Sequence, residues 1–478
     1  MQSAPSLLWH DYETFGTNPR ADAACQFAAI RTDLDLNIIG KPIDIFCQIP
    51  SDYLPQPEAV LVTGITPQQT IRDGYIEAEF AHKISGYMSE ANTTVVGYNS
   101  IRFDDEVTRT LFYRNFIDPY AREWQHGNAR WDIIDLVRAC YALRPEGIEW
   151  PKNDDGAPIF KLDQLTLANG ISHQNAHDAV ADVKATIEMA KLIKQRQPAL
   201  FDYYYALRKK QAVFDIVDLQ SRKPFVHVSG MISSAQGCIS WLYPLCQHPT
   251  NNNAVICIDL NQDIDNLFAH DSQTLKQLLY APSSELAATE SRPAIKVVHC
   301  NKSPFVAPAK ALSPELADKH GVDRALCRHN LDRLMHNNAL SEKISDIFSE
   351  DRSEAPILDV DQAIYARGFP SQADKEWLSE VRNAKPQNLA IWQEKAPNKL
   401  YLEQLFRYRA RNYPDTLTQQ EIDKWQQHRR GRFVDGVNSN YLTVEKYLQG
   451  VHDLSELYEN NPEKLTLLKQ LVAFASQI

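Results

Sequence analysis

LLWHDYETFG, residues 7–16, places two acidic residues in a run that otherwise has the character of a buried strand. Side chains of a strand alternate between its two faces, so Asp11 and Glu13 share a face and lie about 7 Å apart along the chain. Neighbouring carboxylates repel each other and lose hydration when buried, which makes such a pair costly in a purely structural strand. The stretch therefore predicts a strand that carries a functional acidic pair.

The length and composition of the chain limit its class. A chain of 478 residues is too long for one hydrophobic core, so we expect two to four domains. The sequence contains no run of 18 apolar residues, so no membrane span is predicted. The N-terminal residues lack the pattern of a secretion signal. Eight cysteines without a C-x-x-C pair indicate reduced thiols and argue against a zinc module. We expect a cytoplasmic protein.

Charge is distributed unevenly along the chain. The net charge is −11, and residues 1–200 hold 18 Lys and Arg against 27 Asp and Glu. An acidic chain is a poor candidate for binding nucleic acid through bulk attraction. A polyanionic ligand would therefore have to be held by local basic grooves or by metal ions.

Hydrophobic patterns divide the chain into three parts. Residues 1–197 alternate strands and helices, as in an α/β domain; residues 198–352 read as a small β domain; residues 353–478 show helical patterns. The predicted strands are 27–34, 44–49, 93–99, 223–230, 238–246, 253–260 and 295–306, and the clearest helices are 78–88, 104–116, 132–144 and 178–197. In the last of these, Ala179, Val183, Ile187 and Ala190 form one apolar face. Pro198 is expected to mark the end of the first domain.

Two further motifs complete the acidic pair. NSIRFDDEV (99–107) carries Asp104 at the start of a helix, and AHDAVADVKAT (176–186) carries His177 and Asp182. Four carboxylates in a small volume cannot all stay ionised unless cations neutralise them, and oxygen ligands suit Mg²⁺ or Mn²⁺. Two such ions, about 3.5–4 Å apart, stabilise the attacking and leaving oxygens of a phosphoryl displacement. The motifs predict a two-metal site.

His177 fits the remaining role in this chemistry. A neutral imidazole can accept a proton from the attacking water at physiological pH, so His177 is the candidate general base. Two assignments stay open at this point. Either Asp104 or Asp105 could face the metals while the other stabilises the helix N-terminus, and Asp178 is a rival to Asp182 that we assign to the helix N-terminus.

HDYETFG, NSIRFDDEV and AHDAVADVKAT resemble the three motifs of the DEDD exonuclease superfamily, in its histidine-bearing branch. GYNSIRFDDEVTR, RACYALRPEGI, RQPALFDY, VHVSGM and FRYRARN look like the bacterial exonuclease I family, from residue 7 to beyond residue 410. The resemblance implies a processive, Mg²⁺-dependent 3′-to-5′ exonuclease, with Mn²⁺ as a substitute, that degrades single-stranded DNA to 5′-mononucleotides in repair and recombination.

The resemblance also implies an architecture and a set of roles. Residues 1–197 would form a ribonuclease-H-like exonuclease domain, residues 198–352 an SH3-like domain and residues 353–478 a helical C-terminal domain, together a C-shaped clamp around the strand. The implied catalytic residues are Asp11, Glu13, Asp104, His177 and Asp182, with Asp11, Glu13 and Asp182 as metal ligands. The F-D spacing of the second motif favours Asp104 over Asp105.

Substrate contacts follow from the same resemblance. The residues implied along the bound strand are Glu13, Arg109, Tyr120, Trp124, Arg138 and Lys161, whose types suit phosphate pairing and base stacking. Core packing is the alternative for Tyr120 and Trp124, and a solvated surface lysine is the alternative for Lys161. The arginines of FRYRARN (406–412) are instead expected on a helix, paired with acidic neighbours.

The implied protein partner is the acidic C-terminal tail of single-strand DNA-binding protein, received by Lys223 and Arg324. Ser313 and Met335 stand where further basic residues are expected, so this contact is expected to be weakened or rearranged. We expect a monomer, because a clamp that closes within one chain needs no second copy. The competing functions are a 3′-end-trimming ribonuclease, a proofreading subunit and a binding module without catalysis.

Overall fold

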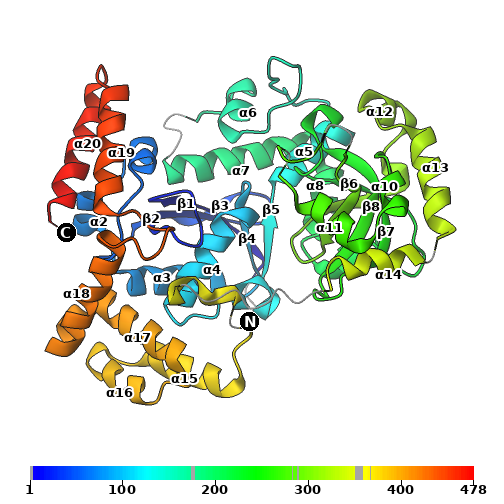
Figure 1. The fold of residues 1–478 in the computed structure, drawn as a ribbon. Coiled ribbons are helices and arrows are strands. Elements are labelled where there is room, and N and C mark those ends of the chain that lie inside the picture. The colour runs from blue at the N-terminus through cyan, green and yellow to red at the C-terminus, as the bar shows by residue number, and fades with distance from the viewer. Residues whose placement is uncertain are drawn as a thin grey trace. The chain divides into compact units, whose positions relative to one another are not determined.

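The computed structural model describes residues 4–173, 178–282, 284–287, 290–337, 339–349, 359–366 and 368–477. The chain divides into two compact units (Figure 1). The first unit comprises residues 1–129, 174–184 and 354–478, and the second comprises residues 130–173 and 185–353. Both ends of the chain belong to the first unit, so the two units are interleaved along the sequence.

The sheet of the first unit is built around the acidic strand. Four neighbouring strands of this sheet lie in the order β3 (Ile38–Phe46), β2 (Ala24–Thr32), β1 (Ser6–Thr14) and β4 (Thr93–Gly97). β1 pairs antiparallel with β2 and parallel with β4, and β2 pairs antiparallel with β3. The predicted strands at 27–34, 44–49 and 93–99 are confirmed. β3 begins earlier than predicted, because its first residues are exposed and therefore lack the apolar pattern.

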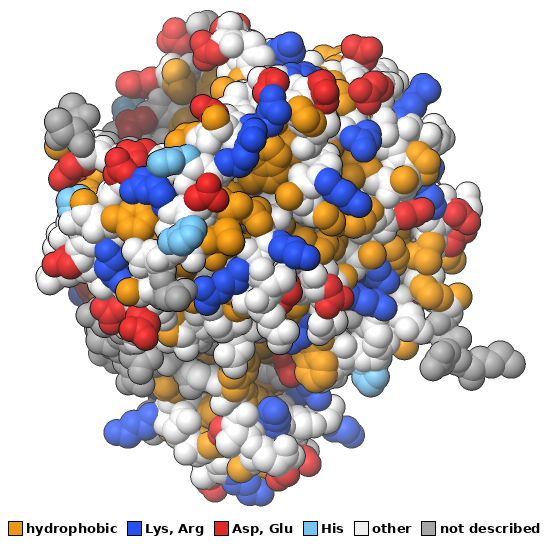
Figure 2. Space-filling model, turned by 90° about the vertical axis from the view of Figure 1, so that its right-hand side faces the viewer, with side chains coloured by type: hydrophobic (Ala, Val, Ile, Leu, Met, Phe, Trp, Pro, Cys, Tyr) orange, Lys and Arg blue, Asp and Glu red, His pale blue; other side chains and the backbone are white. Residues whose placement is uncertain are grey.

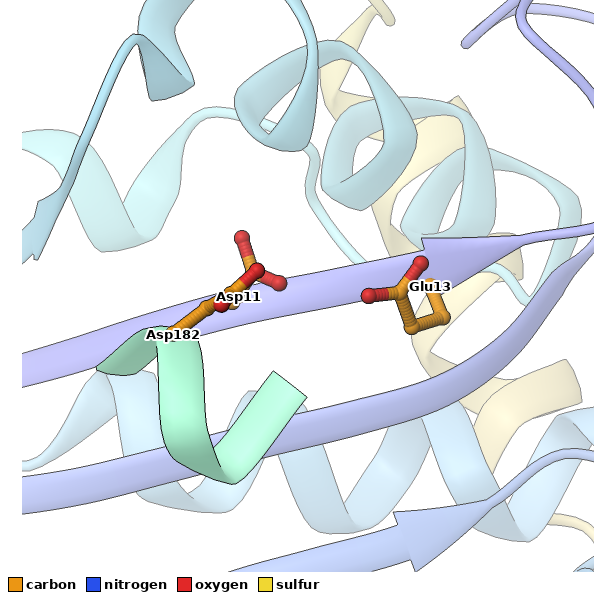
Figure 3. Close-up of side chains that lie close together, drawn as sticks. All are labelled: Asp11, Glu13 and Asp182. Atoms are coloured by element: carbon orange, nitrogen blue, oxygen red, sulfur yellow. The ribbon is translucent and has the colours of Figure 1, made fainter. Parts of the chain in front are cut away.

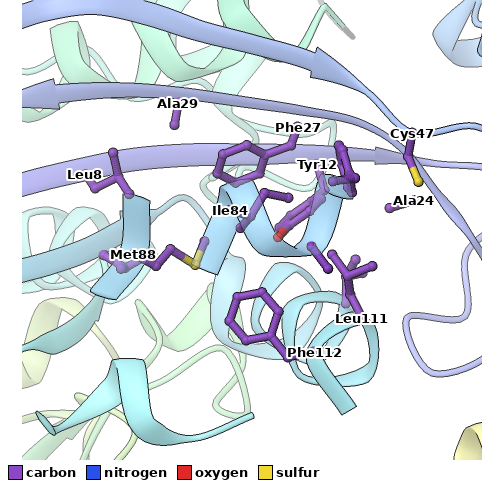
Figure 4. Close-up of a cluster of buried hydrophobic side chains, with 14 residues drawn as sticks. Leu8, Tyr12, Ala24, Phe27, Ala29, Cys47, Ile84, Met88, Leu111 and Phe112 are labelled. Atoms are coloured by element: carbon purple, nitrogen blue, oxygen red, sulfur yellow. The ribbon is translucent and has the colours of Figure 1, made fainter. Parts of the chain in front are cut away.

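Helices α3 (Glu77–Ser89) and α4 (Asp104–Arg114) contribute to the apolar core of this unit together with the sheet. Leu8 and Tyr12 of β1 point into that core, beside Phe27 of β2 (Figure 4). Burial of a side chain of this size stabilises the fold by about 1.5–3 kcal/mol. Since strand side chains alternate, the burial of Leu8 and Tyr12 directs Asp11 and Glu13 to the opposite face of β1.

α7 (Ala179–Arg196) carries the third motif. Ala179, Val183, Ile187 and Ala190 are all buried, which confirms the predicted apolar face. The first turns of α7, with Asp182, belong to the first unit, and the rest of the helix belongs to the second. Pro198 occupies the first turn of the next helix, where a missing N–H costs nothing. The domain boundary expected at this proline stays a prediction.

The described residues after 358 confirm the predicted helical region, and their last two helices pack against the N-terminal part of the chain. Phe433, Tyr447 and Leu471 share one core with Phe15 and Val60. The remaining helices of the first unit are α1 (Pro57–Thr63), α2 (Pro67–Asp73), α15 (Gln372–Asn383), α16 (Leu389–Glu394), α17 (Lys399–Asn412), α18 (Gln419–Phe433), α19 (Val444–Leu457) and α20 (Pro462–Ala475).

The second unit contains an antiparallel sheet in the order β10-β6-β7-β8-β9. Its strands are β6 (Phe225–Val228), β7 (Ile239–Gln247), β8 (Ala254–Asp259), β9 (Ile295–His299) and β10 (Phe305–Pro308). The single strand predicted at 295–306 is wrong, because the chain turns between β9 and β10, where Ser303 adopts a positive φ of 45°.

Several short elements of the second unit were not predicted, β5 (Ala129–Asp132) among them. The helices assigned mainly to this unit are α5 (Ile134–Leu143), α6 (Leu162–Ala168), α8 (Pro198–Ala206), α9 (Lys210–Phe214), α10 (Asp265–Ala269), α11 (Ser272–Tyr280), α12 (Pro314–Lys319), α13 (Arg324–Met335) and α14 (Ala339–Asp346). Among the described helices of the whole chain, none combines the length and apolar character needed to cross a membrane.

Candidate active site

The acidic residues of β1 lie where this strand extends beyond its parallel neighbour, β4. β4 pairs with β1 only from Ser6 to Trp9, whereas β2 follows β1 as far as Thr14. Asp11 and Glu13 therefore lie beyond the carboxyl end of the parallel pair. Ligand sites of open α/β sheets form at such ends, because the backbone there is no longer covered by a neighbouring strand.

Three carboxylates converge at this position. Asp11, Glu13 and Asp182 each offer one carboxylate oxygen, and these oxygens lie within 4.8 Å of one another (Figure 3). Asp182 comes from the first turn of α7, and all three side chains are partly buried. A set of oxygen ligands alone suits hard divalent cations such as Mg²⁺ or Mn²⁺. The structure thus brings the three predicted metal ligands together.

The electrostatics of the three carboxylates favour a bound cation. Burial, with repulsion from Asp104, Glu13 and Asp182, raises the pKa of Asp11 well above its ordinary value. Burial and the same kind of repulsion raise the pKa of Glu13 to about 8. Without a cation this site holds protons at neutral pH, and a divalent cation would displace them.

Asp104 faces this acidic site from the start of α4. Its side chain is buried, and its Oδ1 accepts a hydrogen bond from the amide of Tyr12 at 3.2 Å. Asp105 points elsewhere, because its Oδ1 accepts a hydrogen bond from Nη2 of Arg122 at 2.6 Å. Repulsion from Asp104 contributes to the raised pKa of Asp11 and Glu13. The geometry therefore favours Asp104 over Asp105 as the fourth carboxylate.

Gly97, at the end of β4, makes the approach of this segment possible. A Cβ at Gly97 would lie 2.5 Å from the Cβ of Ser100, a distance that real Cβ atoms do not show. A larger residue would push the chain away just before it turns into α4. The glycine thus helps to bring Asp104 close to β1.

His177, the predicted general base, lies outside the described residues. Its neighbour Asp178 is described, and its Oδ1 accepts a hydrogen bond from the amide of Ala181 at 2.9 Å. This is the geometry of a helix N-cap, which confirms the assignment of Asp178 to the start of α7.

Arg109, a predicted substrate contact, is buried between two carboxylates. Its Nη1 donates to Glu106 at 2.8 Å, and its Nε and Nη2 donate to Glu123 at 2.8 and 3.0 Å. Although burial lowers it, the charge and hydrogen bonds of Glu123 hold the pKa of Arg109 above its ordinary value. The guanidinium also lies 5.1 Å from the ring centre of Tyr120. Its charge is already compensated within the fold.

A cavity of about 560 Å³ lies beside these residues in the first unit. Trp124 is 67% exposed and Phe369 87% exposed, so neither packs in a core, and the ring of Tyr120 meets that of Phe369 edge-on at 5.9 Å. The cavity is lined by Tyr113, Phe116, Ile117, Asp118, Pro119, Tyr120, Trp124, Ile364, Tyr365, Gly368, Phe369, Pro370, Lys375, Leu378, Ser379, Arg382, Tyr401 and Gln404. Exposed aromatic rings with nearby cations suit the stacking of nucleobases.

Two predicted substrate residues lie in the second unit. Arg138 donates from Nη1 to Asp135 at 2.7 Å and is largely buried. Lys161 is exposed immediately before α6. The structure therefore leaves Lys161 accessible, whereas the charge of Arg138 is paired.

The predicted partner residues are also in the second unit. Lys223 is exposed, and Arg324 pairs with Asp318 at 3.3 Å at the start of α13. On the face drawn in Figure 2, Lys and Arg side chains of the described residues are interspersed with apolar side chains. A second cavity, of about 270 Å³, combines Arg144 with apolar walls that include Tyr203 and Phe305.

The arginines of FRYRARN lie on α17 and pair with acidic residues, as predicted. Arg409 binds Glu421, while Arg407 and Arg411 enter a buried network with acidic residues from distant segments. We call this network the ion cluster; its members are Asp52, Asp359, Asp361, Arg407, Arg411 and Arg432. The interpretation of FRYRARN as structural and not as a nucleic-acid patch is confirmed.

Sequence reasoning missed several residues beside the site. Arg122, which holds Asp105, and Tyr365 and Phe369, which line the larger cavity, belong to no motif identified above. Arg122 stands 16 residues after the acidic residues at 104–106, and no local spacing connects it to them. Tyr365 and Phe369 lie more than 200 residues from that helix in sequence, and no local pattern connects them to it.

Three family models match consecutive parts of the chain. The model "Exonuclease" matches residues 8–190, "Exonuclease I SH3-like domain" matches residues 208–350, and "Exonuclease I C-terminal domain" matches residues 358–478. The predicted boundaries at 197/198 and 352/353 stay predictions.

Curated relatives match the chain along its length. Exodeoxyribonuclease I of Escherichia coli is 48% identical over 477 residues, covering 99% of this chain and 98% of that protein. Exodeoxyribonuclease I of Haemophilus influenzae is 48% identical over 475 residues, with 99% and 98% covered.

Solved structures of E. coli exonuclease I match the fold. Its complex with a dA16 oligonucleotide superposes with a TM-score of 0.95 at 47% identity, covering 99% of both chains. Its zinc-bound complex with single-stranded DNA gives 0.93 at 47% identity, with 99% of both chains covered, and an SSB/exonuclease I structure with the inhibitor CFAM gives 0.91 at 46%, with 99% and 100% covered. The chain therefore belongs to the exonuclease I family, and it is an exonuclease with an α/β exonuclease domain, an SH3-like domain and a helical C-terminal domain.

Proposed function

We propose that this protein is a processive, Mg²⁺-dependent exonuclease that removes 5′-mononucleotides from the 3′ end of single-stranded DNA. The observation that carries the proposal is the convergence of Asp11, Glu13 and Asp182 within 4.8 Å, with Asp104 adding its charge. The E. coli relative that matches along the whole chain has been solved with DNA oligonucleotides, which supports the substrate class.

The four carboxylates would hold the metal ions. Bound divalent ions supply Lewis-acid stabilisation of the charge that develops on the attacking and leaving oxygens. The raised pKa of Glu13 and Asp11 shows that this pocket opposes uncompensated negative charge. The carboxylates therefore orient the cations and the scissile phosphate together, while β1 and α7 supply a rigid base.

We propose His177 as the general base. It stands five residues before Asp182, on the segment that leads into α7. The imidazole would take a proton from water as the water oxygen bonds to phosphorus. The bond from phosphorus to the 3′ oxygen then breaks, and that oxygen is protonated to become the new 3′-hydroxyl of the shortened strand.

The cavity beside α4 is our candidate path for the strand away from its 3′ end. Trp124 and Tyr120 offer ring faces or edges to bases, and Glu13 lies at the reacting end. Among the proposed backbone contacts, the exposed Lys161 is expected to contribute most. Arg109 and Arg138 already pair with carboxylates and are expected to contribute less to phosphate binding.

We propose a contact with the acidic tail of single-strand DNA-binding protein through Lys223 and Arg324. The SSB/exonuclease I structure among the relatives supports this partner, and the exposure of Lys223 is compatible with it. A cytoplasmic role in DNA repair and recombination, as a monomer, completes the proposal. All eight cysteines are unpaired in the structure, as expected in a reducing compartment.

The test compares the unmodified protein with Asp182→Asn and with the control Asp202→Asn, which alters an exposed aspartate on α8. Single-stranded DNA labelled at the 3′ or the 5′ end is incubated with Mg²⁺ or with EDTA, beside duplex DNA and RNA. We expect metal-dependent release of mononucleotides from the 3′ end, lost only in Asp182→Asn. Preference for RNA would favour the trimming ribonuclease, and strand binding without cleavage would favour a binding module.

A further inference from the structure

An ion pair is buried directly beneath the first turn of α4. Nη2 of Arg122 lies 2.6 Å from Oδ1 of Asp105, and the two side chains are 1% and 2% exposed. Arg122 belongs to the short 3₁₀ helix η2 (Ala121–Glu123), and Asp105 is the second residue of α4. The pair therefore ties η2 to the helix on which Asp104 stands.

The Asp105–Arg122 ion pair is a poor source of folding stability. Among the described residues, Nε and Nη1 of Arg122 have no hydrogen-bond partner, so one nitrogen carries the whole interaction. Burying a guanidinium costs several kcal/mol of desolvation free energy, and an ion pair with incomplete hydrogen bonding offsets little of that cost. A well-packed apolar pair could replace Asp105 and Arg122 without loss of folding stability. The presence of the ion pair therefore indicates a requirement other than stability.

The first turn of α4 shows what that requirement is. Asp104, Asp105 and Glu106 are consecutive, and Phe103 supplies no side-chain cap to this helix end. Asp105 binds Arg122, while Asp104 is directed to the amide of Tyr12. Neighbouring residues of an α-helix are separated by about 100° of rotation, so fixing the direction of Asp105 also fixes that of Asp104.

We propose that Arg122 is a positioning residue of the metal site: by holding Asp105 it sets the rotation of the first turn of α4 and so aims Asp104 at the metal-binding carboxylates. The inference rests on the proposed function, because it assigns Arg122 a role toward that same site. Residues that orient metal ligands from behind typically change metal affinity or activity by about 10–100-fold when removed.

A second ion pair strengthens the same connection. Glu123, next to Arg122, binds Arg109 one turn further along α4, at 2.8 Å. The flanking residues Tyr120 and Trp124 line the cavity of about 560 Å³. One short segment thus carries both the clamp on α4 and part of the proposed base-binding surface, and Arg122 fixes the two relative to each other.

The test uses a neutral replacement of both partners, so that no unpaired charge is left buried. The variant is Asp105→Asn/Arg122→Met. Its matched control, Glu77→Gln/Arg114→Met, removes a similar ion pair at the other end of α4, where Arg114 Nη2 and Glu77 Oε2 are 2.5 Å apart and the side chains are 9% and 6% exposed. Mn²⁺ binding to metal-free protein is measured by electron paramagnetic resonance and calorimetry, with DNA hydrolysis alongside.

We expect Mn²⁺ affinity to fall by about 10–100-fold in Asp105→Asn/Arg122→Met and to stay at the wild-type level in the control. Arg122→Lys, which keeps the charge but loses the planar fork, is expected to give an intermediate affinity. This variant also decides the matter if the double variant does not fold.

Wild-type Mn²⁺ affinity in a folded Asp105→Asn/Arg122→Met protein, or in Arg122→Lys if the double variant does not fold, would show that the pair is only structural and overturn the proposal. An equal loss of affinity in the Glu77→Gln/Arg114→Met control would also overturn it, because the effect would then belong to α4 as a whole. Failure of the unmodified protein to bind Mn²⁺ or to cleave DNA would instead refute the proposed function itself.

Discussion

The first unit contains two groups of inward-facing carboxylates, and their electrostatics are opposite. In the metal site, the charges that act on Asp11 and Glu13 come from other carboxylates, and the pKa of both is raised. In the ion cluster, Asp361 is buried more deeply, yet arginines hold its pKa well below the ordinary value, and the same is true of Asp52.

The difference shows what burial of an acidic residue does and does not indicate. Desolvation disfavours the charged form in both groups, so burial alone cannot separate a structural carboxylate from a functional one. The charges around them separate the two groups. The ion cluster finds compensating charge within the chain, at Arg407, Arg411 and Arg432. Asp11 and Glu13 face other carboxylates, and a bound divalent cation would compensate their charge. The next three experiments use this contrast.

The largest effect is expected when the metal site loses a carboxylate. We predict that Asp11→Asn lowers the rate of DNA hydrolysis by about 10³-fold or more, because several kcal/mol of transition-state stabilisation depend on the bound ions. Thermal unfolding in EDTA should show equal or greater stability, since the substitution removes repulsion. A clear loss of metal-free stability would mean that Asp11 belongs with the structural carboxylates.

The ion cluster should respond in the opposite sense. Asp361→Asn leaves buried arginines undercompensated, so we predict a loss of about 3–5 kcal/mol in the free energy of unfolding. Denaturant titration measures this loss, with Asp415→Asn at an exposed position as the control. The Mg²⁺ dependence of the folded fraction should be unchanged, and a shift in that dependence would contradict the contrast.

The pH dependence of stability should separate the groups again. Because the pKa of Glu13 is about 8 in the folded, metal-free protein, that protein binds more protons than the unfolded chain between the ordinary carboxyl pKa and pH 8. The stability contributed by this site therefore falls as pH rises through that window, whereas the contribution of Asp361 is present at neutral pH and is lost in acid.

Saturating Mg²⁺ should restore the stability that the protein loses near pH 8. At a Mg²⁺ concentration 100 times its dissociation constant, the free energy of unfolding should rise by about 2.7 kcal/mol. Unfolding curves recorded from pH 4 to pH 9, with EDTA and with Mg²⁺, measure both contributions. Identical curves in the two conditions would contradict the assignment of the carboxylates to metal binding.

The smallest effect is expected in the cavity. We predict that Trp124→Ala weakens binding of single-stranded DNA by about 1 kcal/mol, the lower end of the range for one stacked base, because other rings line the same cavity. Fluorescence anisotropy in EDTA measures the change without cleavage. Tyr280→Ala, at another exposed aromatic residue, is the control and should leave the affinity unaltered.

Much of the site was predictable because its parts are local. Asp11 and Glu13 stand out against an apolar strand, and Asp182 sits on a helix whose buried face is plain from its spacing. The choice between Asp104 and Asp105 came from the resemblance to the family motif and not from a local pattern, because both occupy the same turn. In the structure Asp104 accepts a hydrogen bond from the amide of Tyr12, whereas Asp105 pairs with Arg122. The fold class followed from alternating patterns, while exposed strand residues such as Ile38 and the turn within 295–306 gave no such signal.

The cavity and the ion cluster depend on long-range contacts. Phe369 meets Tyr120 across 249 residues, and the link between Asp52 and Arg411 spans 359. No periodicity in a single sequence reports contacts at such separations. What the sequence did reveal is that the arginines of FRYRARN needed acidic partners; it could not say which.

The ion cluster has a consequence for how the protein folds during its synthesis on the ribosome. Asp52 is synthesised early, but its partner Arg432 follows near the end of the chain. At a translation rate of about 5–20 residues per second, the aspartate waits roughly 20–80 s for its counter-charges. The surroundings of Asp52 are therefore complete only when the last helices have been synthesised, so this part of the nuclease finishes folding at or after the end of translation.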